Sequence, residues 1–260
     1  MITKEIQDTK LKLKAALKAH NYDAHNENVL KVIENLSDLW KKQQIPEAPS
    51  KSKLLYGDWR ILSTPQFPDR IINDDEPEKF QYTLGRMAFN LFEPRKAIVT
   101  ILYPETYNLV HNFTSEMDDN KSSYNFMNKI IIHTESGDLP AELFMEGYCT
   151  PKTDNKLNVA FVSGELRKSP EVDNDEKILQ LWNKTFNGIY KKSDQERSVK
   201  ERLIRWLMMN ILSITYPSDE SMKYEMKRVV HAHVEILFLD DEMRITKGSR
   251  GSVVIVTREK

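Results

Sequence analysis

The feature that most limits the possible folds is a change in the spacing of apolar residues near residue 54. Before that point, apolar residues recur every three or four positions, which is typical of amphipathic helices. From residue 54 to residue 167 they tend to alternate with polar residues, which is typical of strands with one buried face. We therefore expect a short helical segment followed by a much longer region that is rich in β-strands.

The N-terminal segment, residues 1–48, predicts two helices with a break at residues 21–23. Thr3 is placed to cap the first helix, because its hydroxyl can accept a hydrogen bond from a free backbone N–H. The second helix is marked by apolar residues at helical spacing: Val29, Val32, Ile33, Leu36, Leu39 and Trp40. Pro46 and Pro49 end this segment, and residues 50–53 are interpreted as a linker. Each helix has a single apolar stripe, so the pair must pack together or on a larger body.

Residues 54–260 form the second expected unit, which is mainly β. Strands are predicted over residues 55–64, 80–92, 97–103, 107–113, 129–135, 142–150, 156–166, 229–239, 243–246 and 252–257. Short turns between successive strands imply antiparallel neighbours, and this number of strands favours a barrel or a sandwich. A helical insert at about residues 171–226 interrupts the pattern before the closing strands. Within it, Ser198 and Glu201 form a candidate capping box in front of an apolar helix.

Composition excludes several classes of protein. The chain has 38 basic and 39 acidic residues among 260, whereas proteins that coat nucleic acid usually carry a basic excess, so we expect no nucleic-acid partner. The single cysteine, Cys149, has no partner for an internal disulfide, which favours a reducing compartment over secretion. Residues 1–5 also lack the layout of a secretory signal. No apolar run approaches the roughly 18 residues of a membrane helix, so membrane contact is expected to be peripheral at most.

Two passages carry a resemblance to a known family. They are residues 54–62, LLYGDWRIL, and residues 238–252, FLDDEMRITKGSRGS. Together they resemble the opening and closing patterns of the plastid lipid-associated proteins, also called plant fibrillins. In the closing pattern, Phe238 stands where the family has a tyrosine, Asp241 and Glu242 supply the acidic pair, and Thr246 and Lys247 are conservative changes. The resemblance covers both ends of the chain and is weak in the middle.

The resemblance implies a lipocalin-like antiparallel β-barrel that binds or shields a hydrophobic small molecule. Implied cargoes are lipids, carotenoids and prenylquinones at photosynthetic membranes, either at thylakoids or at plastoglobules. The implied location is the cytoplasm, or a plastid stroma with thylakoid association. The family has no common catalytic residues to transfer.

A closed barrel brings its first strand beside its last ones, which would place Arg244 near Trp59. We predict that the Arg244 guanidinium lies on the Trp59 indole, a cation–π contact of about 0.5–2 kcal/mol. Asp240 or Asp241 is predicted to hold the arginine by charge-assisted hydrogen bonds. The two residues either contact the ligand or only plug one end of the barrel.

Strand alternation supplies further candidates for ligand contact, although aromatic and β-branched residues in strands also serve simply as core. On residues 80–92, Tyr82 and Phe89 belong to opposite rows, and the pattern does not decide which row faces inward. On residues 229–239, the predicted inner row contains Val230, Val234, Ile236 and Phe238. The full candidate set is Trp59, Tyr82, Phe89, Phe144, Phe161, Val234, Ile236, Phe238 and Arg244.

The sequence has no nucleophile elbow, P-loop or dinucleotide-binding glycine motif. His231, His233 and Glu235 have a spacing that can chelate zinc, but they more simply alternate outward from an apolar row. We interpret Cys149 as a packed residue rather than a reactive thiolate. No catalytic residue, metal or cofactor is therefore assigned.

Three functions remain open from the sequence. The first is a noncatalytic barrel that binds a hydrophobic small molecule. The alternative is an interaction adaptor, in which the barrel is a scaffold and the helices within residues 175–215 bind a protein partner. The third is a lipid-modifying enzyme, which would need a polar cluster deep in the barrel with perturbed pKa values.

Overall fold

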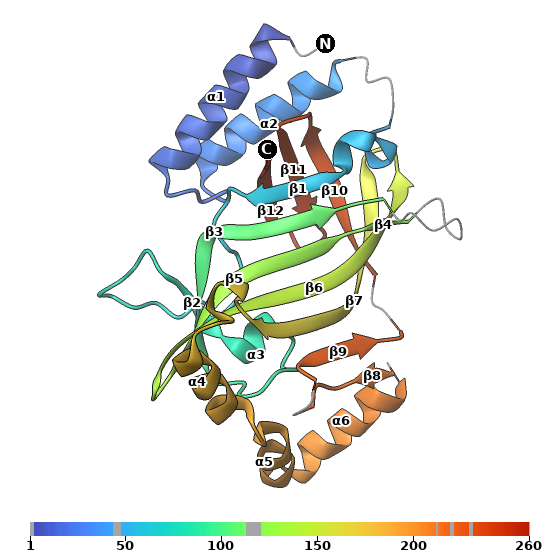
Figure 1. Ribbon diagram of the computed structural model, residues 1–260. Helices are drawn as coiled ribbons and strands as arrows, with labels where there is room; N and C mark the ends of the chain where they lie inside the picture. The colour runs from blue at the N-terminus through green and yellow to red at the C-terminus, as the bar shows by residue number, and fades with distance from the viewer. Residues whose placement is uncertain are drawn as a thin grey trace.

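The computed structural model describes residues 3–43, 48–112, 121–211, 213–218, 221–228 and 231–259. Two helices, α1 (Lys4–Ala19) and α2 (Glu27–Lys41), lie side by side across one end of the molecule (Figure 1). The Thr3 hydroxyl caps α1 by accepting from the backbone N–H of Ile6, 3.4 Å away, as predicted. The expected linker instead contains two short 3-10 helices, η1 (Pro49–Lys51) and η2 (Lys53–Leu55).

Eight strands of the described chain close into an antiparallel barrel. They are β1 (Gly57–Ile61), β3 (Ile98–Val110), β5 (Asn125–Thr134), β6 (Gly137–Thr153), β7 (Lys156–Lys168), β10 (His231–Leu239), β11 (Met243–Gly248) and β12 (Val253–Arg258). The ring closes because β1 pairs with β3 on one side and with β12 on the other. The predicted fold, a mainly β barrel with two N-terminal helices and a helical insert, is confirmed.

Four short strands of the described residues extend the sheet outside this ring. They are β2 (Phe80–Thr83) on β3, β4 (Ser122–Ser123) on β6, β9 (Lys223–Met226) on β7, and β8 (Ile214–Thr215) on β9. The single strand predicted over residues 80–92 is wrong. Thr83 ends β2 and caps the short helix α3 (Leu84–Met87) by accepting from the backbone N–H of Arg86. Phe89 and Asn90 then adopt left-handed backbone conformations, with φ of 54° and 58°, which is typical of a turn.

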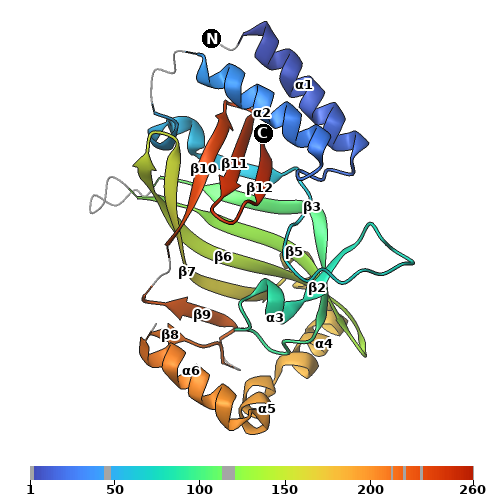
Figure 2. The ribbon, with the colours of Figure 1, turned by 180° about the vertical axis from the view of Figure 1, so that it is seen from behind.

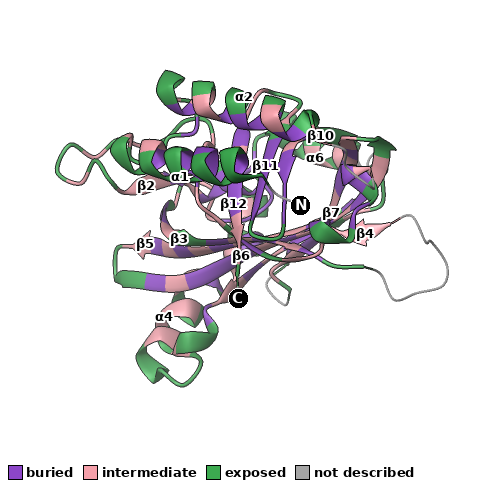
Figure 3. Ribbon diagram, turned by 90° about the horizontal axis from the view of Figure 1, so that it is seen from above, coloured by how far each residue is buried: buried purple, intermediate pink, exposed green. Residues whose placement is uncertain are grey.

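One cluster of buried apolar side chains joins the two N-terminal helices to the barrel. The helices cover the outer face of β10, β11 and β12, as Figures 2 and 3 show from behind and from above. The ring centroids of Trp40 on α2 and Phe238 on β10 are 5.8 Å apart. The cluster includes Ile6, Leu13, Leu17, Val29, Ile33, Leu36, Met243, Ile245, Val253 and Ile255. The apolar stripes of the helices are thus buried against the sheet.

A second cluster lies at the far ends of the long strands β3, β5 and β6. There the strands are covered by β2, α3 and the insert, which consists of η3 (Pro170–Val172), α4 (Glu176–Phe186), α5 (Ile189–Glu196), α6 (Val199–Ile211), β8 and β9. The insert forms the end of the molecule opposite α1 and α2 (Figure 1). Within the described chain, no helix combines the length and apolar character needed to cross a bilayer.

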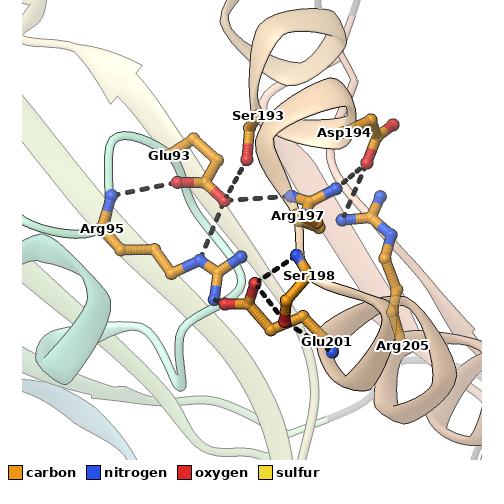
Figure 4. A network of polar contacts seen from close by, with 8 residues as sticks. All are labelled: Glu93, Arg95, Ser193, Asp194, Arg197, Ser198, Glu201 and Arg205. Carbon is orange, nitrogen blue, oxygen red and sulfur yellow. Dashed lines mark hydrogen bonds and ion pairs between the residues drawn. The ribbon is translucent and has the colours of Figure 1, made fainter.

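The insert is tied to the barrel by a polar network centred on Glu93 (Figure 4). The Glu93 carboxylate accepts from Arg95 Nε at 2.9 Å, Ser193 Oγ at 2.8 Å and Arg197 Nη2 at 3.0 Å. Burial acts to raise the pKa of Glu93, but the hydrogen bonds from Arg95 and Ser193 outweigh burial and hold this pKa below its ordinary value. The predicted capping box is confirmed, because the Glu201 backbone N–H donates to Ser198 Oγ and the Ser198 N–H to the Glu201 carboxylate.

Candidate binding site inside the barrel

Strand register identifies the inner face of the barrel, because residues paired across neighbouring strands share a face. Trp59 pairs with Asn108 on β3, and Asn108 pairs with Phe126 on β5. Arg244 pairs with Val256, which also pairs with Ile61, two residues from Trp59. Trp59 and Arg244 therefore both point into the barrel.

The predicted contact between Trp59 and Arg244 is confirmed. The guanidinium carbon of Arg244 lies 4.9 Å from the centroid of the Trp59 ring. Trp59 is 0% exposed and Arg244 is 2% exposed. The first and last barrel strands thus meet with an aromatic ring and a cation in contact, in a site where desolvation strengthens such a contact.

One end of the barrel is closed around Trp59. Its indole Nε1–H donates to the Leu55 carbonyl in η2 at 2.9 Å. The guanidinium carbon of Arg258 lies 4.2 Å from the same ring. Arg258 also donates to the carbonyl oxygens of Leu54, Tyr56 and Asp241. This end is therefore covered by η2 and by hydrogen-bonded side chains.

The prediction that Asp240 or Asp241 holds Arg244 is wrong. Asp240 pairs with Lys10 of α1 at 2.5 Å, and its other oxygen accepts from the backbone N–H of Met243 at 2.7 Å. Asp240 stands in the turn between β10 and β11, from which its side chain reaches α1. Arg244 Nη2 donates instead to Oδ1 of Asn108, a neutral acceptor.

The other two guanidinium nitrogens of Arg244 have no hydrogen-bond partner in the part of the chain that the structure describes. Its Nε and Nη1 are buried without a hydrogen-bond acceptor. Burial lowers the pKa of Arg244 from its ordinary value, because desolvation disfavours the charged form. Burial also raises the pKa of Tyr124, whose ring centroid is 5.8 Å from the guanidinium. It raises the pKa of the nearby Cys149 thiol to about 11.

The rest of the inner face is largely apolar. Phe161, Val159 and Leu157 contribute from β7, opposite Gly147, Cys149 and Pro151 of β6. The ring centroids of Phe126 and Phe161 are 5.9 Å apart. Several inner-face side chains are only partly buried, namely Ile61, Phe126, Phe161, Val234 and Val254. The inner face thus combines apolar surface with one buried cation.

Five of the nine predicted ligand residues lie on this inner face: Trp59, Phe161, Val234, Ile236 and Arg244. Phe238 does not, which corrects the predicted inner row. A register shift between Ile236 and Phe238 turns Phe238 to the outer face, where it contacts Trp40. A bulge inverts the alternation of every later residue in the strand. Val230, in the same predicted row, lies outside the described residues.

The other three candidates lie away from the barrel interior. Tyr82 is buried in the second cluster, where its hydroxyl donates to the Pro65 carbonyl at 3.3 Å. Phe144 is on the outer face of β6, under the guanidinium of Arg167 at 5.2 Å. Phe89 is 61% exposed in the turn after α3. A continuous strand over residues 80–92, as predicted, would instead have placed Phe89 in the wall of the barrel.

Sequence reasoning missed Asn108, Tyr124 and Cys149 as neighbours of Arg244. A buried asparagine within an apolar strand is a usable signal, because a buried amide requires a hydrogen-bond partner. Tyr124 has no such signal, since it precedes β5 and its position depends on the pairing of β4 with β6.

A separate groove of about 580 Å³ lies outside the barrel, between α1 and strands β1 and β12. Its lining includes the basic side chains of Lys14, Lys18, Arg60 and Arg258 together with Glu259. The groove is open to solvent and its lining carries five charged side chains, so it is less suited to a neutral hydrophobic molecule than an enclosed apolar interior would be.

No protein-family model matches this chain, and searches of curated proteins and of solved structures found no match either. The resemblance to the plastid lipid-associated proteins therefore stays a prediction. Among the residues that the structure describes, no three His, Cys, Asp or Glu side chains lie close enough to hold a metal ion.

Proposed function

We propose that this protein is a noncatalytic binding protein that holds a hydrophobic small molecule against the inner face of its barrel. The observation that carries this proposal is the form of that inner face. One end is closed by Trp59, η2 and Arg258, while apolar inner-face side chains such as Phe161 and Val234 stay partly exposed. A barrel of about eight strands can enclose one small ligand.

The proposed cargo is a lipid, carotenoid or prenylquinone, the class that the resemblance implies. The proposed location, at or near photosynthetic membranes, is also the one that the resemblance implies. The apolar inner face supports a cargo of this kind, because burying apolar ligand surface contributes about 25 cal/mol per Å².

The chemistry of the polar inner-face groups favours binding over catalysis. With a pKa of about 11, the Cys149 thiol is almost wholly protonated at neutral pH, whereas a nucleophilic cysteine needs its thiolate. Arg244 is a cation whose role is to donate hydrogen bonds. Neither Cys149 nor Arg244 is therefore an activated nucleophile.

Fluorescence titration with the neutral apolar probe N-phenyl-1-naphthylamine tests this proposal. Val234→Trp adds bulk at a partly exposed inner-face position and is expected to weaken binding at least about tenfold. His233→Trp is the matched control, because His233 is the exposed neighbour on the opposite face of β10. No binding by the natural protein, or equal loss in both variants, would contradict the proposal.

A second candidate function, a protein-interaction adaptor, is favoured by the surface of α6. None of its described residues is buried, and Leu203 and Trp206 are 55% and 59% exposed. At about 100° per residue, Val199, Leu203, Leu207 and Ile211 form one outward row. An exposed apolar helix face is typical of a docking surface.

The double variant Leu203→Ser and Trp206→Ser separates the two candidates. Loss of a stoichiometric partner in extracts of cells that make the protein, with binding of the neutral probe retained, supports the adaptor. The absence of any stoichiometric partner of the unaltered protein contradicts it.

A further inference from the structure

Arg244 is a buried cation without a counter-ion in the described parts of the chain. Arg244 is 2% exposed and its side chain points into the barrel. It forms no ion pair within 4.0 Å with a carboxylate of those residues, and its Nε and Nη1 have no acceptor. A buried charge that lacks a partner is costly, because the protein does not replace the lost hydration.

Among the residues that the structure describes, the other strongly buried cations, Lys10 and Arg197, are paired with carboxylates, and Arg244 is the exception. Lys10 lies 2.5 Å from a carboxylate oxygen of Asp240 and 2.9 Å from one of Glu242. Arg197 lies 3.0 Å from a carboxylate oxygen of Glu93. The described chain thus supplies carboxylates to these two buried cations, whereas the hydrogen-bond acceptor that it supplies to the Arg244 guanidinium is the neutral amide of Asn108.

The neighbours of Arg244 among the described residues do not supply negative charge. Arg258 contacts the same Trp59 ring at 4.2 Å and adds a second positive charge to that side of the barrel. The phenol of Tyr124 and the thiol of Cys149 both have raised pKa values and are therefore neutral at neutral pH. The barrel interior is consequently positive around Arg244 and largely apolar beyond it.

We infer that the barrel binds amphiphiles with a single carboxylate head group, which Arg244 holds by charge-assisted hydrogen bonds while the apolar inner face holds the tail. This inference rests on the proposed function and narrows its ligand class. Guanidinium and carboxylate match in charge and hydrogen-bond geometry. Arg258 already donates to three backbone carbonyl oxygens, so of these two arginines Arg244 is the buried cation with free donors. A single such cation amid apolar side chains suits a monoanion with a hydrocarbon tail, such as a long-chain fatty acid.

The experiment compares cis-parinaric acid with its methyl ester, which has the same tail and no charge. Titration of the full chain is expected to show the acid binding at least about tenfold more tightly than the ester. Arg244→Met is expected to abolish this preference and Arg244→Lys to restore part of it. Arg202→Met is the matched control, because Arg202 is an exposed arginine of α6 that lies outside both the barrel and the basic groove.

Asn108→Asp provides a test that leaves Arg244 in place. The new carboxylate would lie where Asn108 Oδ1 now accepts from the guanidinium. It would therefore neutralise the cation and remove the preference for the acid, with binding of the ester retained. This variant keeps the inference falsifiable if Arg244→Met fails to fold.

The outcomes separate this inference from the proposed function. Equal affinity for acid and ester overturns the inference and leaves apolar binding intact. An acid preference that survives both Arg244→Met and Asn108→Asp also overturns it, and would move the carboxylate to the basic groove lined by Lys14 and Lys18. Binding of neither probe removes the inference and the proposed function together.

Discussion

Nζ of Lys10 lies 2.5 Å from Oδ2 of Asp240, which is 230 residues later in the chain. Both side chains are almost fully buried. Asp240 also accepts from the backbone N–H groups of Glu242 and Met243. One carboxylate therefore joins α1 to the turn between β10 and β11, and it helps to hold the N-terminal helices on the barrel.

Removal of the Lys10 charge is expected to destabilise the protein strongly. Lys10→Met leaves the Asp240 carboxylate buried and unpaired, which should lower the free energy of unfolding by about 3–5 kcal/mol. Lys12→Met, at an exposed position of the same helix, should change it by less than about 0.5 kcal/mol. Urea denaturation measures both values, and similar values would show that the buried pair does not anchor α1.

Packing of Trp40 on Phe238 is expected to carry much of the attachment of α2. Trp40→Ala should lower the free energy of unfolding by about 3–5 kcal/mol, because it leaves a cavity between α2 and β10. Trp206→Ala on the exposed face of α6 serves as a matched control and should have little effect. Thermal denaturation of the two variants compares them directly, and an equally large effect of Trp206→Ala would contradict this account of α2.

Trp59 and Arg244 are expected to differ in their contributions to stability. Trp59→Ala removes a fully buried ring and should lower the free energy of unfolding by about 3–5 kcal/mol. Arg244→Met removes a buried cation without a carboxylate partner and should lower it by less than about 1 kcal/mol, or raise it. Guanidinium denaturation tests this contrast. A large loss in Arg244→Met would assign the arginine a structural role.

Acid is expected to weaken the attachment of the insert through Glu93. Because the folded-state pKa of Glu93 is below its ordinary value of 4.5, its contribution to stability is present above about pH 4.5 and is lost as the pH falls through the folded-state value. Hydrogen exchange of α5 amides, measured as a function of pH, should show this loss. Glu93→Gln should remove the pH dependence, whereas Glu196→Gln at an exposed position of α5 should preserve it.

The Cys149 thiol is expected to react slowly with Ellman's reagent in the folded protein. A pKa of about 11 leaves only about 0.1% thiolate at pH 8, and burial limits access. The chain has one cysteine, so the signal has a single source. The control is the protein unfolded in guanidinium, in which Cys149 should react at the rate of an ordinary exposed thiol. If the folded protein in buffer reacted as fast as the unfolded protein, the Cys149 thiol would not be buried.

Much of the architecture was predictable because the short-range spacing of apolar residues indicates which segments form helices and which form strands. Period 3.6 identified the two N-terminal helices, period 2 identified most barrel strands, and local hydroxyl chemistry identified the caps at Thr3 and Ser198. The contact between Trp59 and Arg244 followed from one topological assumption, that the first strand meets the last ones. The family resemblance and the cargo that it implies stay predictions.

The sequence by itself determined which residues share a face of a helix or strand, because that property depends only on the local repeat of the backbone. It did not determine which strand face looks into the barrel, since one bulge after Ile236 reversed the orientation of Phe238. Only the tertiary structure decided that Asp240 forms an ion pair with Lys10 and that Arg244 donates to the neutral amide of Asn108. The reason is physical: partners for buried charges come from residues far apart in the chain, and their choice depends on how the strands close.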